Sequence, residues 1–257
     1  MNERELDKEL RVFCGEHLRL SSVLEFLMGN EEVNALLVKS NDNMIGRMSY
    51  TDHGRVHAKV VALNSLKLFS IISKLVKPTI IAEKDGKIED SLIAVLISAW
   101  LHDVGLGVNR DNHELLGLIK AGPIIKRLLE GIYDAEDRVK LSSFIEEGIL
   151  CHLGTYHSTS IEAGIVCVAD GTDITCGRAR FSYMKSDRDI HDFSAMSIQK
   201  VKIKSGPKCV EVHVFMDSPA GVFQVEETLL KKIKSTKIKH LVKVIVHIKG
   251  EKDLIKY

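Results

Sequence analysis

The chain has 257 residues, of which 45% are hydrophobic and 28% are charged, so it has the composition of a globular protein with ample material for a core. Its 36 lysines and arginines almost balance its 35 aspartates and glutamates, which argues against a bulk polyanion as partner. The absence of a leader-like segment, of an apolar run near ~20 residues and of Cys-x-x-Cys spacing among the five cysteines predicts a reduced, cytoplasmic protein without a membrane span.

The first forty residues alternate charged and apolar side chains at helical spacing and carry no obvious chemistry. A longer helix is expected from about His53 to Val76, with Thr51 or Asp52 as its N-cap. His53 and His57 are four residues apart, so this helix would point both imidazoles to the same side, as in sites that bind one ion through two histidines. Taken singly, each histidine is more often a core or surface residue.

The strongest local signal is an apolar helix that ends abruptly in His102 and Asp103. Residues 92 to 101 are apolar enough to be buried on most sides, and a buried carboxylate beside a buried imidazole is costly unless a shared divalent cation compensates. The alternative is a capped helix end at which Asp103 faces water. A second His-Asp pair, His191 and Asp192, follows a polar run and is expected to lie in a loop without a site.

Histidine and aspartate recur at the ends of the helices that follow. His113 is expected to open the next helix, and Pro123 to begin the segment after it. His152 falls at the C-terminal end of a helix, and Asp170 at the end of a strongly apolar one that Ser160 caps. Because core helices normally end in uncharged caps, this recurrence is the main evidence for a shared polar centre.

From residue 193 onward the pattern changes to strands. Residues 197–204 and 209–216 alternate with period two, 220–237 are helical, and 241–248 form a third strand. This order predicts a strand-strand-helix-strand module whose last connection is one right-handed crossover.

Lysine crowds the end of this module. Amphipathic elements with lysine outside are usually plain solvent-facing surfaces; the alternative is a patch that contacts an anionic substrate, nucleic acid or a partner. The aromatic residues are scattered, which argues against a base-stacking platform and hence against nucleic acid. The strand at 197–204 could pair with its twin in a homodimer, and its lysines could equally block that pairing.

Side chains at the predicted helix ends could together form one centre made only of nitrogen and oxygen donors. Such donors in a helical bundle suit Mn, Fe, Zn, Co or Ni better than soft Cu(I). The candidate metal ligands are His57, His102, Asp103, His113, His152 and Asp170.

This arrangement resembles the HD superfamily of metal-dependent phosphohydrolases, which is defined by a histidine, a later His-Asp pair and a distal aspartate. The matching residues are His57, His102, Asp103 and Asp170. The resemblance covers roughly residues 45–180 and implies an HD-type helical bundle with its metal core there. Together with the strand pattern it predicts a mainly α fold, in which a helical domain over residues 1–190 precedes a small α/β domain over 191–257.

The resemblance also bears on the number of ions. Family members with two extra histidines between the His-Asp pair and the last aspartate hold two divalent metal ions, and His113 and His152 occupy those places. A dinuclear centre is therefore expected, with Asp103 as the bridging carboxylate. The alternatives are that His113 faces solvent at a helix N-terminus and that His152 is a cation favoured by the dipole at a helix C-terminus.

The implied activity is hydrolysis of a small phosphomonoester or phosphodiester, with nucleotides among the candidate substrates, by a water that the metal ions activate. Asp103 and His53 are the candidate catalytic residues. His53 could contact the substrate or carry a proton; the alternative is that it only hydrogen-bonds Asp52 or Asp103. Candidates for holding the substrate are Arg55, Asp173, Arg178 and Arg180. The alternative is that these arginines lie on the surface and pair with Asp173 or Asp187.

Two other functions compete with hydrolysis of a small phosphate ester. A non-catalytic nucleotide-sensing or scaffolding protein would keep the fold and lose the activity, and it predicts weak metal retention, against which the intact ligand set argues. A nuclease predicts a basic groove across the helical domain, whereas the excess lysine lies in the C-terminal module.

Overall fold

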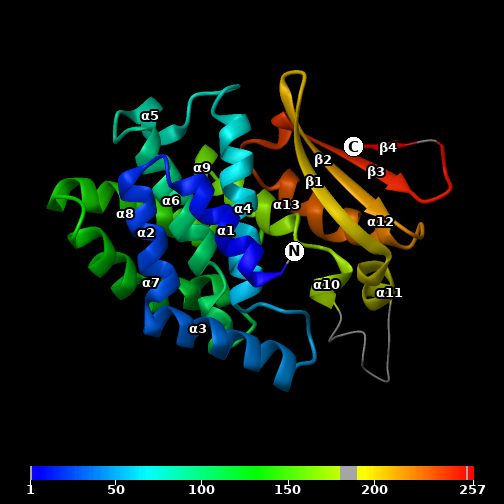
Figure 1. Cartoon of the computed structure of the whole chain (residues 1–257), viewed down its shortest axis with the longest axis horizontal. Helices are drawn as coiled ribbons and strands as arrows, with labels where there is room; N and C mark the ends of the chain where they lie inside the picture. Colours follow the sequence, from blue (N-terminus) through cyan, green and yellow to red (C-terminus); the bar gives the residue numbers. More distant parts are fainter. Residues whose placement is uncertain (1, 180–189, 253) are drawn as a thin grey trace.

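The computed structural model describes residues 2–179, 190–252 and 254–257, which form a helical body with a small sheet at one end (Figure 1). The helices of the body are α1 (Glu3–Cys14), α2 (Leu18–Gly29), α3 (Glu31–Asn41), α4 (Arg55–Ile72), α5 (Thr79–Glu83), α6 (Ile88–Leu101), α7 (His113–Glu130), α8 (Ala135–Cys151) and α9 (Ile161–Gly171). A π-helix, η1 (Asp42–Arg47), follows α3, and a 3-10 turn, η2 (Val104–Gly107), follows α6.

The remaining elements form the C-terminal module. They are α10 (Cys176–Ala179), α11 (Ile190–Ser197), β1 (Ile198–Gly206), β2 (Cys209–Met216), α12 (Gly221–Gln224), η4 (Val225–Leu230), α13 (Lys231–Lys234), η5 (Lys239–Leu241), β3 (Val242–Ile248) and β4 (Ile255–Lys256).

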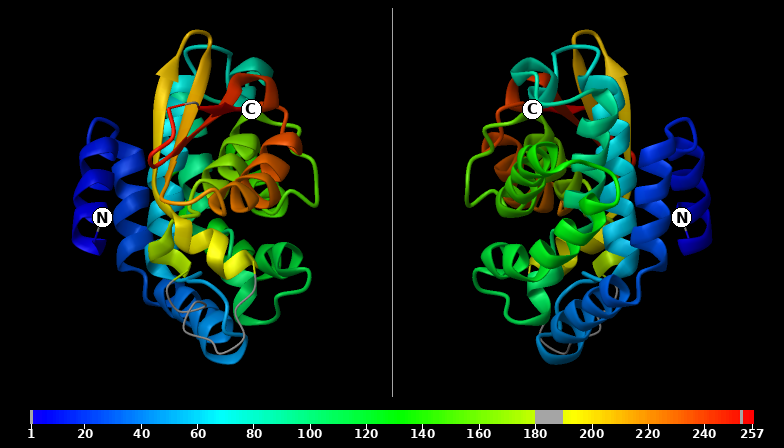
Figure 2. Two further views of the ribbon diagram at one scale, coloured as in Figure 1. Left: turned by 90° about the vertical axis from the view of Figure 1, so that its right-hand side faces the viewer. Right: turned by 90° about the vertical axis from the view of Figure 1, so that its left-hand side faces the viewer.

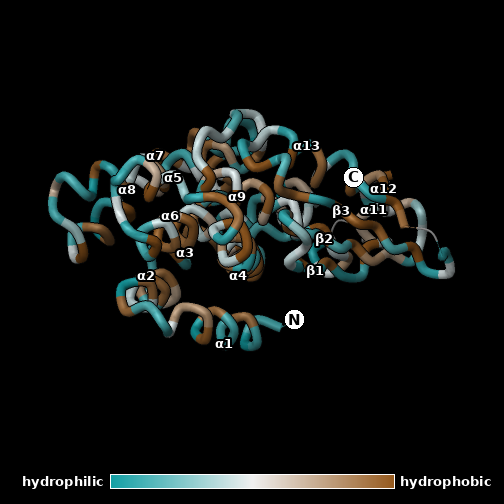
Figure 3. The backbone as a smooth tube through the Cα atoms, turned by 90° about the horizontal axis from the view of Figure 1, so that it is seen from above, coloured by the Kyte–Doolittle hydropathy of each residue, from teal (hydrophilic) through white to brown (hydrophobic). Residues whose placement is uncertain are grey.

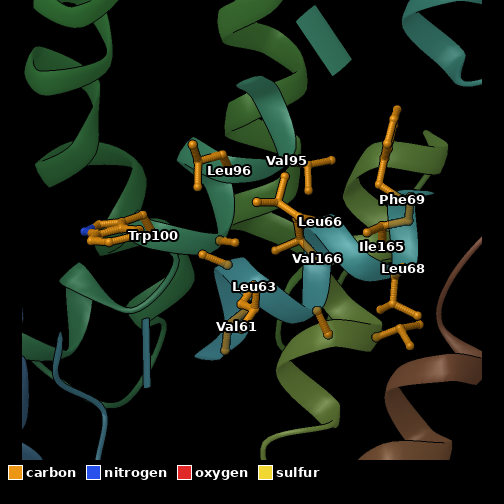
Figure 4. Close-up of a cluster of buried hydrophobic side chains, with 14 of the residues drawn as sticks. Val61, Leu63, Leu66, Leu68, Phe69, Val95, Leu96, Trp100, Ile165 and Val166 are labelled. Carbon is orange, nitrogen blue, oxygen red and sulfur yellow. The ribbon is translucent and has the colours of Figure 1, made fainter. Parts of the chain in front are cut away.

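Helix α6 is the centre of the body, because α2, α4, α8 and α9 all pack against it. Figure 4 shows Val95 and Leu96 of α6 among Leu66 of α4 and Val166 of α9. The stretch from Ile88 to Gly107 is long and apolar enough to cross a membrane, yet 94% of its apolar 18-residue window is buried inside the protein. Its all-round apolar surface is therefore explained by burial in a protein core.

The N-terminal helices lie on one flank of this core. Figure 2 shows α1 and α2 (blue) beside α4 (cyan), and α1 packs on α4 while α2 packs on α6. Partly buried ion pairs hold α1 in place, because the Nζ atom of the buried Lys59 on α4 lies 2.8 Å from Glu3 Oε1 and 2.6 Å from Asp7 Oδ1. The N-terminal segment is thus a fixed part of the body.

Within the described residues the strands form one sheet in the order β1-β2-β3-β4. β1 and β2 are antiparallel, with Val201 opposite Val214, and β2 and β3 are parallel, with Val212 opposite Val244. The chain between β2 and β3 runs through α12, η4 and α13, which confirms the predicted strand-strand-helix-strand order. The short edge strand β4, antiparallel to β3, was not predicted. Figure 3 shows α12 and α13 on one side of the strands.

The structure corrects the predicted start of α4. The helix begins at Arg55 with Gly54 as its N-cap, and neither Thr51 nor Asp52 caps it. Asp52 Oδ1 accepts the Gly54 N–H at 2.8 Å, a tight turn that keeps the preceding residues out of the helix. His53 therefore precedes α4 and does not share a helix face with His57.

Two other expectations about helix boundaries were wrong. Pro123 lies inside α7, where the buried residues Ala121 and Ile124 on either side hold the helix together despite the missing N–H donor. His191 and Asp192 lie in α11, not in a loop. The polar run before them lies outside the described residues.

Gly105 allows η2 to pack directly on the first turn of α7. A Cβ at this position would lie 2.0 Å from the carbonyl oxygen of His113 and 2.5 Å from the amide nitrogen of Gly117. Only a residue without a side chain fits there, so the sequence at 105 sets the distance between the turn that carries Asp103 and the helix that carries His113.

We expect Gly105→Ala to lower the free energy of unfolding by about 1–3 kcal/mol or more, because the added methyl group must push two backbone segments apart. Gly29→Ala is the control, since a Cβ at Gly29 meets nothing within 4 Å and alanine favours the helix by up to about 1 kcal/mol. Urea denaturation of both variants measures the difference. Equal stability of the two would contradict the packing described here.

Candidate metal centre

Buried side chains from α4, α6, α7, α8 and α9 meet in the middle of the helical body. Their exposed fractions lie between 0% and 6%, so all of them are removed from bulk water. They are His57 in the first turn of α4, His102 after α6, Asp103 before η2, His113 at the start of α7, His152 after α8 and Asp170 near the end of α9. The structure thus brings together the side chains that the sequence singled out as metal ligands.

The turn that carries Asp103 is held from the N-terminal side of the chain. Ser40 Oγ donates a hydrogen bond to the carbonyl oxygen of Asp103 at 3.0 Å, and Asn43 Nδ2 donates to the carbonyl oxygen of Leu106 at 2.6 Å. Both donors come from the α3–η1 segment and are buried. The backbone at Asp103 and in the turn that follows it is therefore fixed.

One set of donor atoms gathers around His57. Its Nε2 atom lies 3.1 Å from His102 Nε2, 3.3 Å from Asp103 Oδ2 and 3.3 Å from Asp170 Oδ1. His102 Nε2 is also 3.1 Å from Asp103 Oδ2. Two imidazole nitrogens and two carboxylate oxygens thus face a common point.

A second set gathers around the other oxygen of Asp103. Asp103 Oδ1 lies 3.4 Å from His152 Nε2 and 3.6 Å from His113 Nε2, and these two nitrogens are 3.1 Å apart. The two oxygens of Asp103 therefore face different sets of histidines, and this carboxylate lies between them.

The rings are oriented by hydrogen bonds on their far sides. His102 Nδ1 donates to the carbonyl oxygen of Ala99 at 2.8 Å, and His152 Nδ1 donates to that of Ile149 at 2.6 Å. His113 Nδ1 donates in the same way to Arg110, at 2.8 Å. A carbonyl oxygen can only accept, so each of these Nδ1 atoms carries a proton, and in the neutral form of each ring the lone pair of Nε2 faces the centre.

His57 is oriented by a carboxylate instead. Its Nδ1–H donates to Asp173 Oδ2 at 2.7 Å. Burial and the charge of Arg178 lower the pKa of His57, but hydrogen bonds to Asp103, Asp170 and Asp173 outweigh them and raise it to about 10. A proton on Nε2 is therefore favoured strongly in the metal-free centre, where it offsets part of the carboxylate charge.

These donor atoms fit divalent cations. Around His57 Nε2 three acceptors converge, and one proton can bond to only one of them at a time. Asp103 Oδ2 is buried without a hydrogen-bond partner among the described residues, and such an orphaned acceptor is costly. A cation would bond all of these atoms together. Imidazole nitrogens mixed with carboxylate oxygens are donors that Mn, Fe, Co, Ni and Zn accept.

The carboxylates stay ionised despite their burial. Burial raises the pKa of Asp103, but the charge of His102 and the close contacts of the surrounding histidine nitrogens hold it well below its usual range. Burial also raises the pKa of Asp170, but the charge of Lys232 and the interaction with His57 outweigh it and hold this pKa well below its usual range. Both groups are therefore available as anionic ligands at neutral pH.

His53, a candidate catalytic residue, lies beside the centre. Its ring packs edge-on against His57 with 5.5 Å between ring centroids, and its Nδ1 donates to the carbonyl oxygen of Thr51 at 2.7 Å. Among the described residues, the His53 ring therefore hydrogen-bonds neither Asp52 nor Asp103. Burial, Arg178 and His57 keep the pKa of His53 well below its usual value, so the ring is neutral at pH 7 with a free Nε2.

The candidates for substrate binding have different positions. Arg178 lies at the centre, with Nη2 3.2 Å from His57 Nε2 and Nη1 3.8 Å from Asp170 Oδ1. Asp173 stands behind His57 and orients its ring. Arg55 is exposed in the first turn of α4, where its charge acts on Glu3. Arg180 lies outside the described residues.

Sequence reasoning missed Lys232, which reaches the centre from the C-terminal module. This side chain is buried, and its Nζ pairs with Asp170 Oδ2 and donates to the carbonyl oxygen of His152. A signal existed, because Lys232 follows the buried residues Val225 and Leu229 at helical spacing and so falls on their face. The surrounding exposed lysines hid it.

A buried carboxylate next to His113 was also missed. Glu114 Oε2 lies 3.7 Å from His113 Nδ1 and has no hydrogen-bond partner among the described residues. It adds negative charge behind the second set of donors. The sequence offers no sign of its burial, since it follows His113 in the first turn of α7, where acidic residues are common.

Comparisons with known proteins agree with this geometry. A family model described as the HD domain matches residues 63–175, which include every candidate ligand except His57, placed just before the match. The chain is 38% identical over 234 residues to the uncharacterized protein MJ1020 of Methanocaldococcus jannaschii, and the match covers 90% of each chain. No solved structure matches the chain.

The buried His-Asp clusters lie within the matched range, apart from His57 just before it. The HD domain is helical, as is the body of this chain. The chain therefore belongs to the HD domain family, whose members are generally metal-dependent phosphohydrolases.

Proposed function

We propose that the protein hydrolyses a small phosphomonoester or phosphodiester, with nucleotides among the candidate substrates, at a centre of two divalent cations. The position of Asp103 carries the proposal. Its Oδ2 faces His57 and His102, and its Oδ1 faces His113 and His152, so one carboxylate can serve two ions. Bound there, the cations would activate a water and neutralise charge on a phosphoryl oxygen.

The residues around the donors suit the remaining steps. His53 is neutral with a free Nε2 beside the centre, so it can take a proton from the attacking water or give one to the leaving group. Arg178 is held by its Nε on the carbonyl oxygen of Asp52 and by Nη1 on that of Asp173. Its Nη2 lies 3.2 Å from His57 Nε2, so a fixed positive charge stands beside the donor atoms and could pair with phosphoryl oxygens there.

Water is a better nucleophile here than the nearby cysteines. Cys151 precedes His152, and burial raises the pKa of its thiol to about 12. Cys167 lies on α9 near Asp170, and burial raises the pKa of its thiol to about 11. Both are protonated at neutral pH, and a thiol is a weak nucleophile.

We also propose a reducing, cytoplasmic location for the protein. All five cysteines are free thiols, as is usual in that compartment.

A small substrate is favoured over a nucleic acid. The ligand side chains are almost completely buried, which restricts access to a small group on the substrate. On the sheet, the ring of Phe215 stacks on that of His247 with 4.3 Å between centroids. Lys202 Nζ, from the neighbouring strand β1, lies 5.5 Å from the centroid of the Phe215 ring. The faces of this ring are already used, so it offers little for stacking a base.

Replacing Asp103 tests the proposal as a whole. Asp103→Asn removes the charge shared by both donor sets, so we expect loss of bound metal and a decrease in kcat of roughly 10²- to 10³-fold or more. Elemental analysis and phosphate release from nucleotides and aryl phosphates measure the two effects, with circular dichroism to check the fold. The control is Asp111→Asn, an exposed aspartate in the loop before α7. Full activity of Asp103→Asn would refute the assignment.

The number of ions is tested by the second donor set. In His152→Ala we expect one Mn(II) per chain instead of two, because only His113 and one oxygen of Asp103 remain there. Titration calorimetry and elemental analysis count the ions, and the exposed His240 provides a His→Ala control. A single ion in both the parent and His152→Ala would rule out the dinuclear form.

His53 is tested separately from metal binding. His53→Gln keeps a similar volume and removes the basic nitrogen, so we expect kcat to fall by roughly 10²-fold or more. The metal content should not change, because His53 is not among the donor atoms. Steady-state kinetics with elemental analysis separates the two. Loss of metal in this variant would show instead that His53 supports His57.

A further inference from the structure

The C-terminal module contributes a buried cation to the centre. Lys232 lies on α13 and is 8% exposed, whereas Lys231 and Lys234 on the same short helix are exposed. Its Nζ pairs with Asp170 Oδ2 and donates a hydrogen bond of 3.0 Å to the carbonyl oxygen of His152. A single lysine thus contacts segments that carry ligands of both donor sets.

Close packing places this lysine. At Gly171 an added Cβ would lie 3.2 Å from Leu229 Cδ1 and 3.3 Å from Lys232 Cδ. At Gly154, whose φ is +87°, it would lie 3.0 Å from Ser235 Oγ. The absence of side chains at these glycines lets α13 approach both α9 and the turn after His152.

Because of the Lys232–Asp170 pair, the two carboxylate oxygens of Asp170 have different neighbours. Oδ1 lies 3.3 Å from His57 Nε2 and 3.9 Å from His102 Nε2, so it belongs to the first donor set. Oδ2 is taken by the ammonium group of Lys232. The ammonium charge on Oδ2 repels a cation and withdraws electron density from that oxygen, so Oδ2 is a much poorer metal ligand than Oδ1 while the pair is intact.

We propose that Lys232 is a positioning residue that makes Asp170 a one-oxygen ligand and so keeps a coordination place open for water or substrate. The proposal rests on the proposed function and extends it to the C-terminal module. With Asp170 bound through one oxygen, the protein supplies four donors to the first ion: His57 Nε2, His102 Nε2, Asp103 Oδ2 and Asp170 Oδ1. Ions that favour six ligands then retain room for two more.

Stability alone gives a poor reason for burying this pair. Taking a lysine and an aspartate out of water costs about as much as their attraction returns, so apolar residues would stabilise the fold as well. The position of the pair on a candidate ligand points instead to control of that ligand. Partners that orient metal ligands typically change activity roughly 10- to 100-fold when they are replaced.

The test is Lys232→Met in the full chain, which keeps an unbranched side chain one atom shorter than lysine and removes the charge. Asp170 is then free to bind with both oxygens, and the centre loses one positive charge. We expect Mn(II) to bind as tightly as in the parent or more tightly, while water-proton relaxation by the bound Mn(II) decreases because a water ligand is lost. We also expect kcat to fall roughly 10- to 100-fold. Lys232→Arg should restore the relaxation at least in part.

Lys234→Met is the matched control, because it removes a lysine from the exposed side of the same helix. It should leave metal affinity, relaxation and kcat unchanged. Parent-like relaxation in Lys232→Met would overturn the proposal, and so would weaker Mn(II) binding with a loss of thermal stability that Lys232→Arg does not restore. The Mn(II) affinity and the water-proton relaxation are measured without a substrate. They therefore test the role of Lys232 even if the parent protein releases no phosphate.

Discussion

The structure depends on one electrostatic problem, which is how a helical core can hold several imidazoles and carboxylates away from water. Four histidine nitrogens turn toward the centre, and the carboxylates of Asp103 and Asp170 stay ionised beside them. Lys232 and Arg178 offset part of this negative charge, and divalent cations are suited to offset the rest. The positions of the helix ends follow from this requirement.

Much of the fold and most of the centre could be predicted from the sequence. An apolar helix that ends in His102 and Asp103 must place them at the edge of the core, and the same argument locates His152 and Asp170. The alternation of the strands fixed the order of the C-terminal module. These features are local, because each depends on the spacing of residues within one segment.

The rest depends on contacts between distant segments. His53 lies before α4 because Asp52 forms a turn with Gly54, a preference that the helical spacing of the two histidines concealed. Asp173 orients His57 across 116 positions of the chain. Lys232 approaches Asp170 only because glycines on α9 and after α8 let α13 pack closely. The helical spacing in the lysine-rich tail can place Lys232 on a buried face, but it does not show which residue Lys232 meets there.

The donors of the centre come from segments spread from α4 to α9, and the turn around Asp103 is held by residues of α3 and η1. No part of the chain smaller than the packed body can assemble them. Binding of a metal ion by the native state alone would stabilise that state through linkage, and the supply of metal would then also set how much of the protein stays folded. A shortage of the ion would then reduce the lifetime of the protein as well as its turnover.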